Sequence, residues 1–155
     1  MEYEQSGKLP DDSAGVQEKP IAALLERVRA GDYFALLAFI EMNQAHRNAL
    51  DAIRNLIRDR RKVATTVGFG PRYLHSTGQA HKGGPNSGVF LMITCDDPED
   101  LPVPGQRYTF GTIKRLQAHG DYEVLASRGR RVLRVHLTDV ESGLRDLHAA
   151  VQKHA

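Results

Sequence analysis

The chain contains the apolar run Tyr33-Phe-Ala-Leu-Leu-Ala-Phe-Ile40, eight consecutive residues without a charge. Its length and flanks favour a strand that is buried on both faces, which is the usual environment of a strand in a parallel sheet. Val89-Phe-Leu-Met-Ile-Thr94 is a second run of the same kind. Two further strands are predicted at residues 63–67 and 131–137.

Segments with a helical spacing of apolar residues lie between these strands. They predict helices over residues 20–30, 50–57 and 112–126, and after residue 138. Gly31 should lie just past the end of the first helix, and the third should be interrupted near Gly120. Thr138 and Glu141 form a T-x-x-E capping box for the last helix. Helices that alternate with strands predict an α/β fold with a mainly parallel sheet covered on both faces.

Residues 68–88 are rich in glycine and proline, with six glycines and two prolines. Glycine and proline cost about 1 and 3 kcal/mol inside a helix, so a long helix is excluded. Glycine at this density suits a backbone that approaches a ligand closely. The segment follows the strand at residues 63–67, so we expect it at the carboxyl ends of the strands, where parallel sheets bind ligands. Its polar side chains favour an anionic, hydroxyl-rich ligand; the alternative is a long surface loop.

The length of 155 residues suits a single domain with a substantial core. Residues 1–18 hold five acids and one base, and we expect a mobile tail or the end of a linker there. Residues 19–155 should form one folded unit, which carries a net charge of +6. We expect no membrane span and no signal peptide. Cys95 is the single cysteine, which indicates a reducing compartment and a cytoplasmic location.

Three stretches resemble a known family. They are Gly70-Pro-Arg-Tyr-Leu-His-Ser-Thr-Gly-Gln-Ala-His-Lys-Gly-Gly-Pro85, Tyr108-Thr-Phe-Gly-Thr-Ile-Lys114 and Gly129-Arg-Arg-Val-Leu-Arg-Val-His-Leu137. Together they look like the end of a glucose-6-phosphate isomerase module, and most resemble the isomerase half of bifunctional transaldolase/glucose-6-phosphate isomerase proteins. His75-Ser-Thr-Gly-Gln79 is similar to the His-Ser-x-Gly-Gln element of bacterial isomerases. The resemblance extends over about residues 19 to 150. It implies a sugar isomerase (SIS) fold, a three-layer α-β-α sandwich.

The resemblance also implies an enzyme of glycolysis and gluconeogenesis that interconverts glucose 6-phosphate and fructose 6-phosphate, without a metal or an organic cofactor. In that mechanism a histidine or lysine assists opening of the sugar ring, and a carboxylate moves a proton between C2 and C1 through an enediol. His75 matches the family's histidine, and imidazole titrates near neutral pH. Lys114 falls where the family's C-terminal active-site lysine is expected. Substrate contacts are expected from Arg72, Ser76, Thr77, Gln79 and Lys82.

Each of these residues also has a structural alternative. The hydroxyls near residue 76 would suit the cap of a helix that starts there. Lys82 and Lys114 would suit solvated positions on helices. Arg72 would suit an electrostatic clamp, because a guanidinium group pairs bidentately with phosphate.

The chain departs from the family in one respect. A full isomerase has two SIS subdomains, and neither the phosphate-binding loop nor the proton-shuttling glutamate matches a motif here; Glu41 is a candidate by position only. We therefore expect the second subdomain alone, with the carboxylate upstream of Met1. The expected partners are a sugar phosphate, an N-terminal SIS subdomain or transaldolase domain, and a second copy in a homodimer. The main alternative is a non-catalytic SIS module that binds a sugar phosphate or docks with a partner.

Two other classes of function have weaker support. His75, His81 and Cys95 match no zinc spacing. The basic runs at residues 58–62 and 128–131 are more simply a helix C-terminus, where cations suit the helix dipole, and a turn before a strand. We therefore expect neither a metal site nor binding to nucleic acid.

Overall fold

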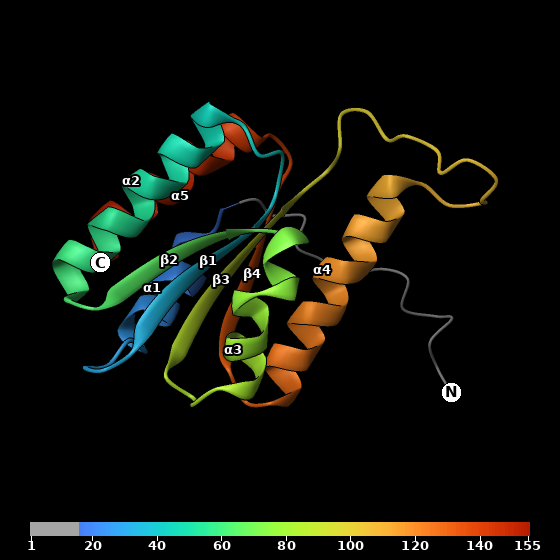
Figure 1. Cartoon of the computed structure of the whole chain (residues 1–155). Helices are drawn as coiled ribbons and strands as arrows, with labels where there is room; N and C mark the ends of the chain where they lie inside the picture. The colour runs from blue at the N-terminus through green and yellow to red at the C-terminus, as the bar shows by residue number, and fades with distance from the viewer. Residues whose placement is uncertain (1–15) are drawn as a thin grey trace.

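The computed structural model describes residues 16–155, which form one parallel sheet between two layers of helices (Figure 1). The strands are β1 (Tyr33–Phe39), β2 (Ala64–Phe69), β3 (Gly88–Cys95) and β4 (Arg131–Leu137). Their order in the sheet is β2-β1-β3-β4, and every neighbouring pair is parallel. The α/β class and the predicted strands are confirmed, and no boundary moves by more than two residues.

The helices cover both faces of the sheet (Figure 1). One layer holds α1 (Glu18–Glu26), α2 (Gln44–Arg61) and α5 (Val140–His154), and the other holds the 3-10 helix η1 (Arg72–His75), α3 (Thr77–Gly83) and α4 (Phe110–Ser127). Alternate residues of β1 belong to the two cores. Leu36 packs in the core under the first layer and Leu37 in the core under the second. Both are fully buried, so the predicted three-layer α-β-α sandwich is confirmed.

Three predicted details of the helices are wrong. Helix α4 runs without interruption through Gly120, because one glycine weakens a helix without ending it. The N-cap of α5 is Asp139 rather than Thr138, since the Asp139 carboxylate accepts from both the backbone N–H and the hydroxyl of Ser142 (2.7 and 2.6 Å). Helix α1 ends at Glu26, well before Gly31, whose φ is +86°.

The tail predicted over residues 1–18 lies largely outside the described residues. Val16 packs against the core. Glu18 begins α1 and accepts from Lys153 (2.6 Å) and His154 (2.9 Å) near the end of α5. These residues therefore belong to the folded part of the chain.

Arg131 connects two segments at the amino ends of the strands. Its guanidinium donates to both carboxylate oxygens of Asp32 (2.5 and 2.9 Å) and to the carbonyl of Arg27 (2.8 Å), which joins β4 to the turn before β1. The two side chains are only 11% and 9% exposed. Hydrogen bonds from Arg131 hold the pKa of Asp32 below its usual value.

We expect Asp32→Asn to lower the free energy of unfolding by about 2 kcal/mol at pH 7, because it leaves a buried guanidinium without its charged partner. A carboxyl whose pKa is lower in the folded state stabilises the fold above its unfolded pKa of about 3.9 and loses that effect as the pH falls below it. The difference between the variant and the wild type in urea unfolding should therefore shrink from about pH 4 to pH 2. A difference that stays constant over this range would contradict the role of the ion pair.

Candidate functional site

The carboxyl ends of β1 and β3 mark the crevice of this sheet. From β1 the chain moves to β2 on one side, and then crosses to β3 on the other side of β1. Parallel sheets bind ligands at such a switch point, beyond the carboxyl ends of the strands. Residues 41–43 follow β1 here, η1 follows β2, and residues 96–97 follow β3.

Tyr73 fixes η1 against the sheet and leaves His75 outside. Its buried ring packs edge-on against Phe39, with 5.7 Å between ring centroids. A Cβ atom on Gly70 would lie 2.5 Å from the same Phe39 ring, so the exit from β2 requires glycine. His75, the last residue of the 3-10 turn, is exposed. The chain thus presents this imidazole near the carboxyl end of β2.

Two guanidinium groups converge on Met42, directly after β1. Arg72 of η1 and Arg47 of α2 lie 3.6 and 3.8 Å from its Sδ. Arg47 also lies over the ring of Phe69, at 5.2 Å from its centroid. The arginines and Met42 are exposed, and guanidinium groups bind phosphate through paired N–H donors. This pair is the arrangement in the site best suited to a phosphate.

The exposed side chains of Ser76, Thr77 and Gln79 follow His75 at the start of α3. Ser76 occupies the N-cap position of α3, but its hydroxyl donates to the Tyr73 carbonyl (3.4 Å) and makes no cap hydrogen bond. The capping role considered for this hydroxyl is therefore wrong. These side chains lie beside His75, where a ligand bound at His75 would meet them.

Lys82, on the same helix, is held in a buried ion pair. Its Nζ donates to Asp121 at 2.6 Å, and the second carboxylate oxygen of Asp121 accepts from the Tyr73 hydroxyl at 2.6 Å. Asp121 is 6% exposed, and burial together with its charge raises the pKa of Tyr73. The neighbouring His81 meets Tyr33 (2.9 Å) at the amino end of β1. Lys82 is therefore not freely solvated, and it anchors α3 to α4.

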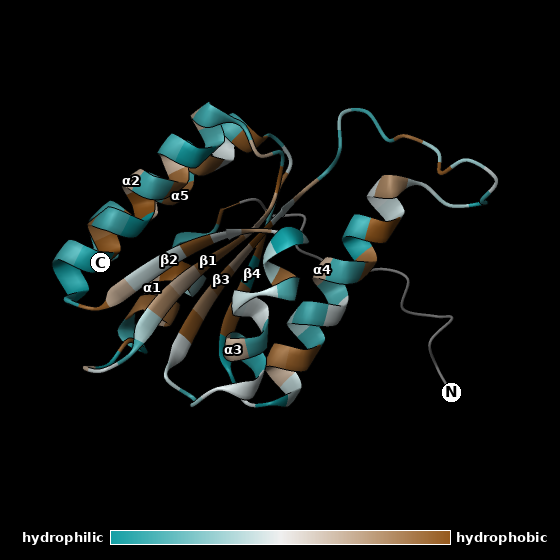
Figure 2. Ribbon diagram, in the orientation of Figure 1, coloured by the Kyte–Doolittle hydropathy of each residue, from teal (hydrophilic) through white to brown (hydrophobic). Residues whose placement is uncertain are grey.

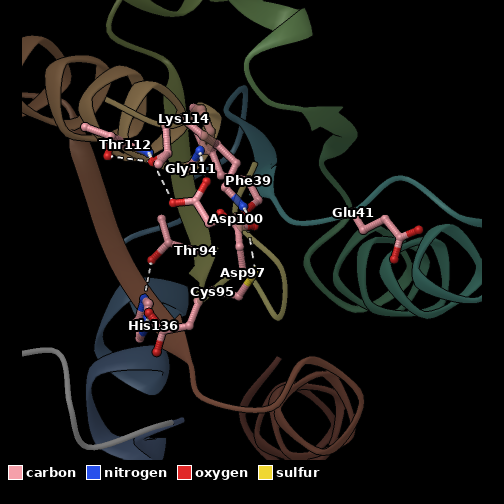
Figure 3. A network of polar contacts seen from close by, with 12 residues as sticks. Phe39, Glu41, Thr94, Cys95, Asp97, Asp100, Gly111, Thr112, Lys114 and His136 are labelled. Atoms are coloured by element: carbon pink, nitrogen blue, oxygen red, sulfur yellow. Dashed lines mark hydrogen bonds and ion pairs between the residues drawn. The ribbon is translucent and has the colours of Figure 1, made fainter. Parts of the chain in front are cut away.

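Lys114 is held at the end of β3 (Figure 3). Its ammonium donates to Asp97, just beyond the strand. Asp100 accepts from the Thr109 hydroxyl (2.6 Å) and from the backbone N–H of Gly111 (2.7 Å), which ties the start of α4 to the same loop. Lys114 and His75 thus lie on the same edge of the sheet, on segments that follow β3 and β2, with β1 between these strands.

A pocket of about 390 Å³ opens at the carboxyl ends of the strands, on the side of α2 and α5. Five carboxylates line it: Glu41, Asp96, Asp97, Asp139 and Glu141. Carboxylates repel a phosphate, but they accept hydrogen bonds from sugar hydroxyls. The pocket is therefore suited to ligand hydroxyl groups, and the pair Arg47 and Arg72 to an anionic group.

Sequence reasoning missed His136 as a member of this edge. Its Nδ1 lies 3.0 Å from the Thr94 hydroxyl, and its Nε2 lies 3.4 Å from Asp96 (Figure 3). In the sequence this histidine follows apolar residues of a predicted strand. A polar residue at such a position was the one feature that could have indicated a role for His136. Cys95, next to Thr94, donates its thiol to the Phe39 carbonyl (3.8 Å), and burial raises its pKa. A buried thiol with a raised pKa is a poor nucleophile.

The described residues also bear on the other kinds of site that were considered. Among residues 16–155, no group of three or more His, Cys, Asp or Glu side chains could hold a metal ion. His81 and Cys95 lie at opposite ends of the sheet. Across this part of the chain, no helix combines the length and apolar character needed to cross a membrane. The basic run at residues 58–62 ends α2, with Lys62 in the left-handed conformation (φ 56°).

Neither a protein-family model nor a curated protein matches this chain. Its fold resembles the crystal structure of a hypothetical protein from Thermus thermophilus, with a TM-score of 0.69 and 19% sequence identity. The likeness shows the fold. It covers 86% of this chain but only 37% of that protein, so the present sequence spans well under half the length of that protein.

Proposed function

We propose that this chain forms the C-terminal SIS subdomain of an isomerase that interconverts glucose 6-phosphate and fructose 6-phosphate. The observation that carries the proposal is the exposed His75, which Tyr73 holds near the carboxyl end of β2 in a parallel sheet. The motif from His75 to Gln79 carries the resemblance to isomerases, and this edge is where an α-β-α sandwich binds ligands. Sequence motif and position in the fold therefore favour the same site.

In the proposed ring opening, the C1 hydroxyl loses its proton, the bond between C1 and O5 breaks, and O5 takes up a proton. His75 donates the proton to O5, because imidazole exchanges protons near neutral pH. Arg47 and Arg72 hold the phosphate at the other end of the open chain. Lys114 stabilises negative charge on the sugar oxygens once the ligand replaces Asp97 as its partner.

The second step moves a proton from C2 to C1 through an enediol and needs a carboxylate. Glu41 lines the pocket at the carboxyl ends of the strands, and its side chain lies apart from Lys114 and Asp100 (Figure 3). Its neighbours match no family motif. We therefore assign the proton transfer to a carboxylate of the companion SIS subdomain.

The test measures conversion of fructose 6-phosphate, coupled to glucose-6-phosphate dehydrogenase, for this chain with its companion subdomain. His75→Ala should reduce kcat by about a hundredfold, which is typical of losing a general acid or base. His148→Ala is the matched control, because His148 lies on α5 in the opposite layer, and it should keep the wild-type rate. Equal rates for wild type and His75→Ala would end the proposal.

A second candidate is a module that binds a sugar phosphate without converting it. The ion pair of Lys114 with Asp97 favours it, since the predicted catalytic lysine is already engaged. Calorimetric titration with fructose 6-phosphate separates the two functions. Binding that requires Arg72 but gives no turnover, even with the companion subdomain, would support the second. Neither binding nor turnover would exclude both.

A further inference from the structure

Helix α4 exposes apolar residues on the side that faces away from the sheet. Ala118, Asp121 and Leu125 are buried on its inner side. Leu116 and Val124 are 64% and 37% exposed, and their helical positions put them on the outer side. In Figure 2, hydrophobic and hydrophilic residues alternate along α4, whereas the outer side of α2 is hydrophilic. Helix α4 therefore has the pattern of a helix with a partner on its outer side.

Gly120 lies on the same outer side, midway between Leu116 and Val124. A Cβ atom on Gly120 would meet nothing within 4 Å, although glycine destabilises the middle of a helix relative to alanine. Two other helical glycines have internal reasons: a Cβ on Gly111 would lie 2.7 Å from Asp100, and one on Gly143 would lie 2.7 Å from Leu137. Gly83 has none, but it is the last residue of α3, whereas Gly120 lies in the middle of α4. The packing around α4 within this chain gives no reason for glycine at position 120.

The outer side of α4 is symmetric about Gly120, because Leu116 precedes it by four residues and Val124 follows it by four. If a second α4 crosses antiparallel at Gly120, Leu116 of each copy lies beside Val124 of the other. The missing side chain at the crossing lets the two backbones approach closely. A two-fold axis repeats every contact, as in most homodimers.

The polar residues beside Leu116, Gly120 and Val124, which together form a stripe along α4, fit the same antiparallel arrangement. Arg115, His119 and Glu123 follow one another at four-residue spacing along one flank of the stripe. In an antiparallel pair this flank faces the same flank of the other copy, with the order reversed. Glu123 of one copy then lies near His119 and Arg115 of the other, and the contact occurs twice. Opposite charges across an interface fix its register and disfavour other partners.

We propose that the outer side of α4 (Leu116, Gly120 and Val124, flanked by Arg115, His119 and Glu123) is the interface of a two-fold symmetric dimer of this chain. The two copies of α4 cross antiparallel at Gly120. The inference does not depend on isomerase activity, since it concerns the face of α4 that points away from the sheet. Loss of dimerisation and loss of turnover can therefore be observed separately.

Sedimentation over a range of concentrations tests the dimer. The wild type should be dimeric, and Leu116→Asp should raise the dimer dissociation constant by at least about thirtyfold, as for a central apolar contact. Glu123→Arg and Arg115→Glu should each weaken the dimer, and the double variant should restore it. Arg145→Glu, an exposed change on α5, is the charge control and should have no effect. A wild-type chain that is monomeric at every concentration, or a dimer indifferent to Leu116→Asp, would overturn the proposal.

Cysteine cross-linking tests the antiparallel register. The native Cys95 is buried, so an introduced cysteine should react first. Gly120→Cys lies on the two-fold axis and should form a disulfide between copies under mild oxidation. Ser127→Cys is exposed on the same side of α4, but the antiparallel register separates its two copies by about 20 Å. Faster cross-linking at residue 127 than at residue 120 would rule out the proposed crossing.

Discussion

Replacing Asp121 by alanine should lower the free energy of unfolding by about 3–4 kcal/mol, one of the largest effects that we expect from a single change. The buried carboxylate accepts from the Tyr73 hydroxyl and from the Lys82 ammonium, both at 2.6 Å. These contacts join η1, α3 and α4, so the variant leaves a hydroxyl and a largely buried charge without a partner. Urea unfolding followed by circular dichroism measures the loss.

Two further variants show whether the lost ion pair is the cause. Asp139→Ala removes an exposed helix cap and should lower the free energy of unfolding much less than Asp121→Ala does. Adding Lys82→Met to Asp121→Ala removes the unpaired charge and should recover part of the stability. If Asp121→Ala unfolds at the same urea concentration as the wild type, the buried network contributes nothing to stability.

The second large effect is expected from Gly70→Ala. The new methyl group would lie 2.5–2.7 Å from three atoms of the Phe39 ring, which is 1% exposed and packs against Tyr73. Because this ring is enclosed in the core, the backbone at the end of β2 has to shift. We expect a loss of about 3 kcal/mol in the free energy of unfolding, measured in the same urea titration.

Gly83→Ala is the matched control for Gly70→Ala. Its Cβ would meet nothing within 4 Å, and Gly83 is the last residue of α3. Alanine there should leave stability unchanged or raise it by about 0.5 kcal/mol. Similar losses for the two variants would show that the close approach to Phe39 is not what requires glycine at position 70.

The sheet was predictable from sequence because its strands are short apolar runs. A run such as residues 33–40 can form its backbone hydrogen bonds and bury every side chain only in a sheet with a layer of helices on each face. The hydropathy of the sequence therefore indicates a strand that is buried on both faces. The end of α1 and the cap of α5 were harder. Asp139 and Thr138 can both cap a helix, and only the local backbone decides that the carboxylate takes both Ser142 donors.

The candidate site was predictable only in part. Residues near one another in the chain, such as Arg72 and His75, reach the same edge because they follow one strand. Contacts between segments that are far apart in the sequence leave no pattern in the residues around either partner. Lys82 meets Asp121 from 39 residues away, and this ion pair holds an ammonium group that the sequence left unpartnered. Arg47 lies on the polar side of α2, and only the folded chain brings it to Met42 beside Arg72.

Cys95 has a consequence for measuring motion in this protein. Its thiol is covered and donates to the Phe39 carbonyl across the junction of β1 and β3. Cys95 is 6% exposed and lines the pocket at the carboxyl ends of the strands, so its alkylation should be slow in this structure and faster when this end of the sheet opens. Because the sequence contains one cysteine, the rate of alkylation reports on the exposure of this one thiol. The unmodified chain therefore carries a native reporter of motion at the carboxyl end of its sheet.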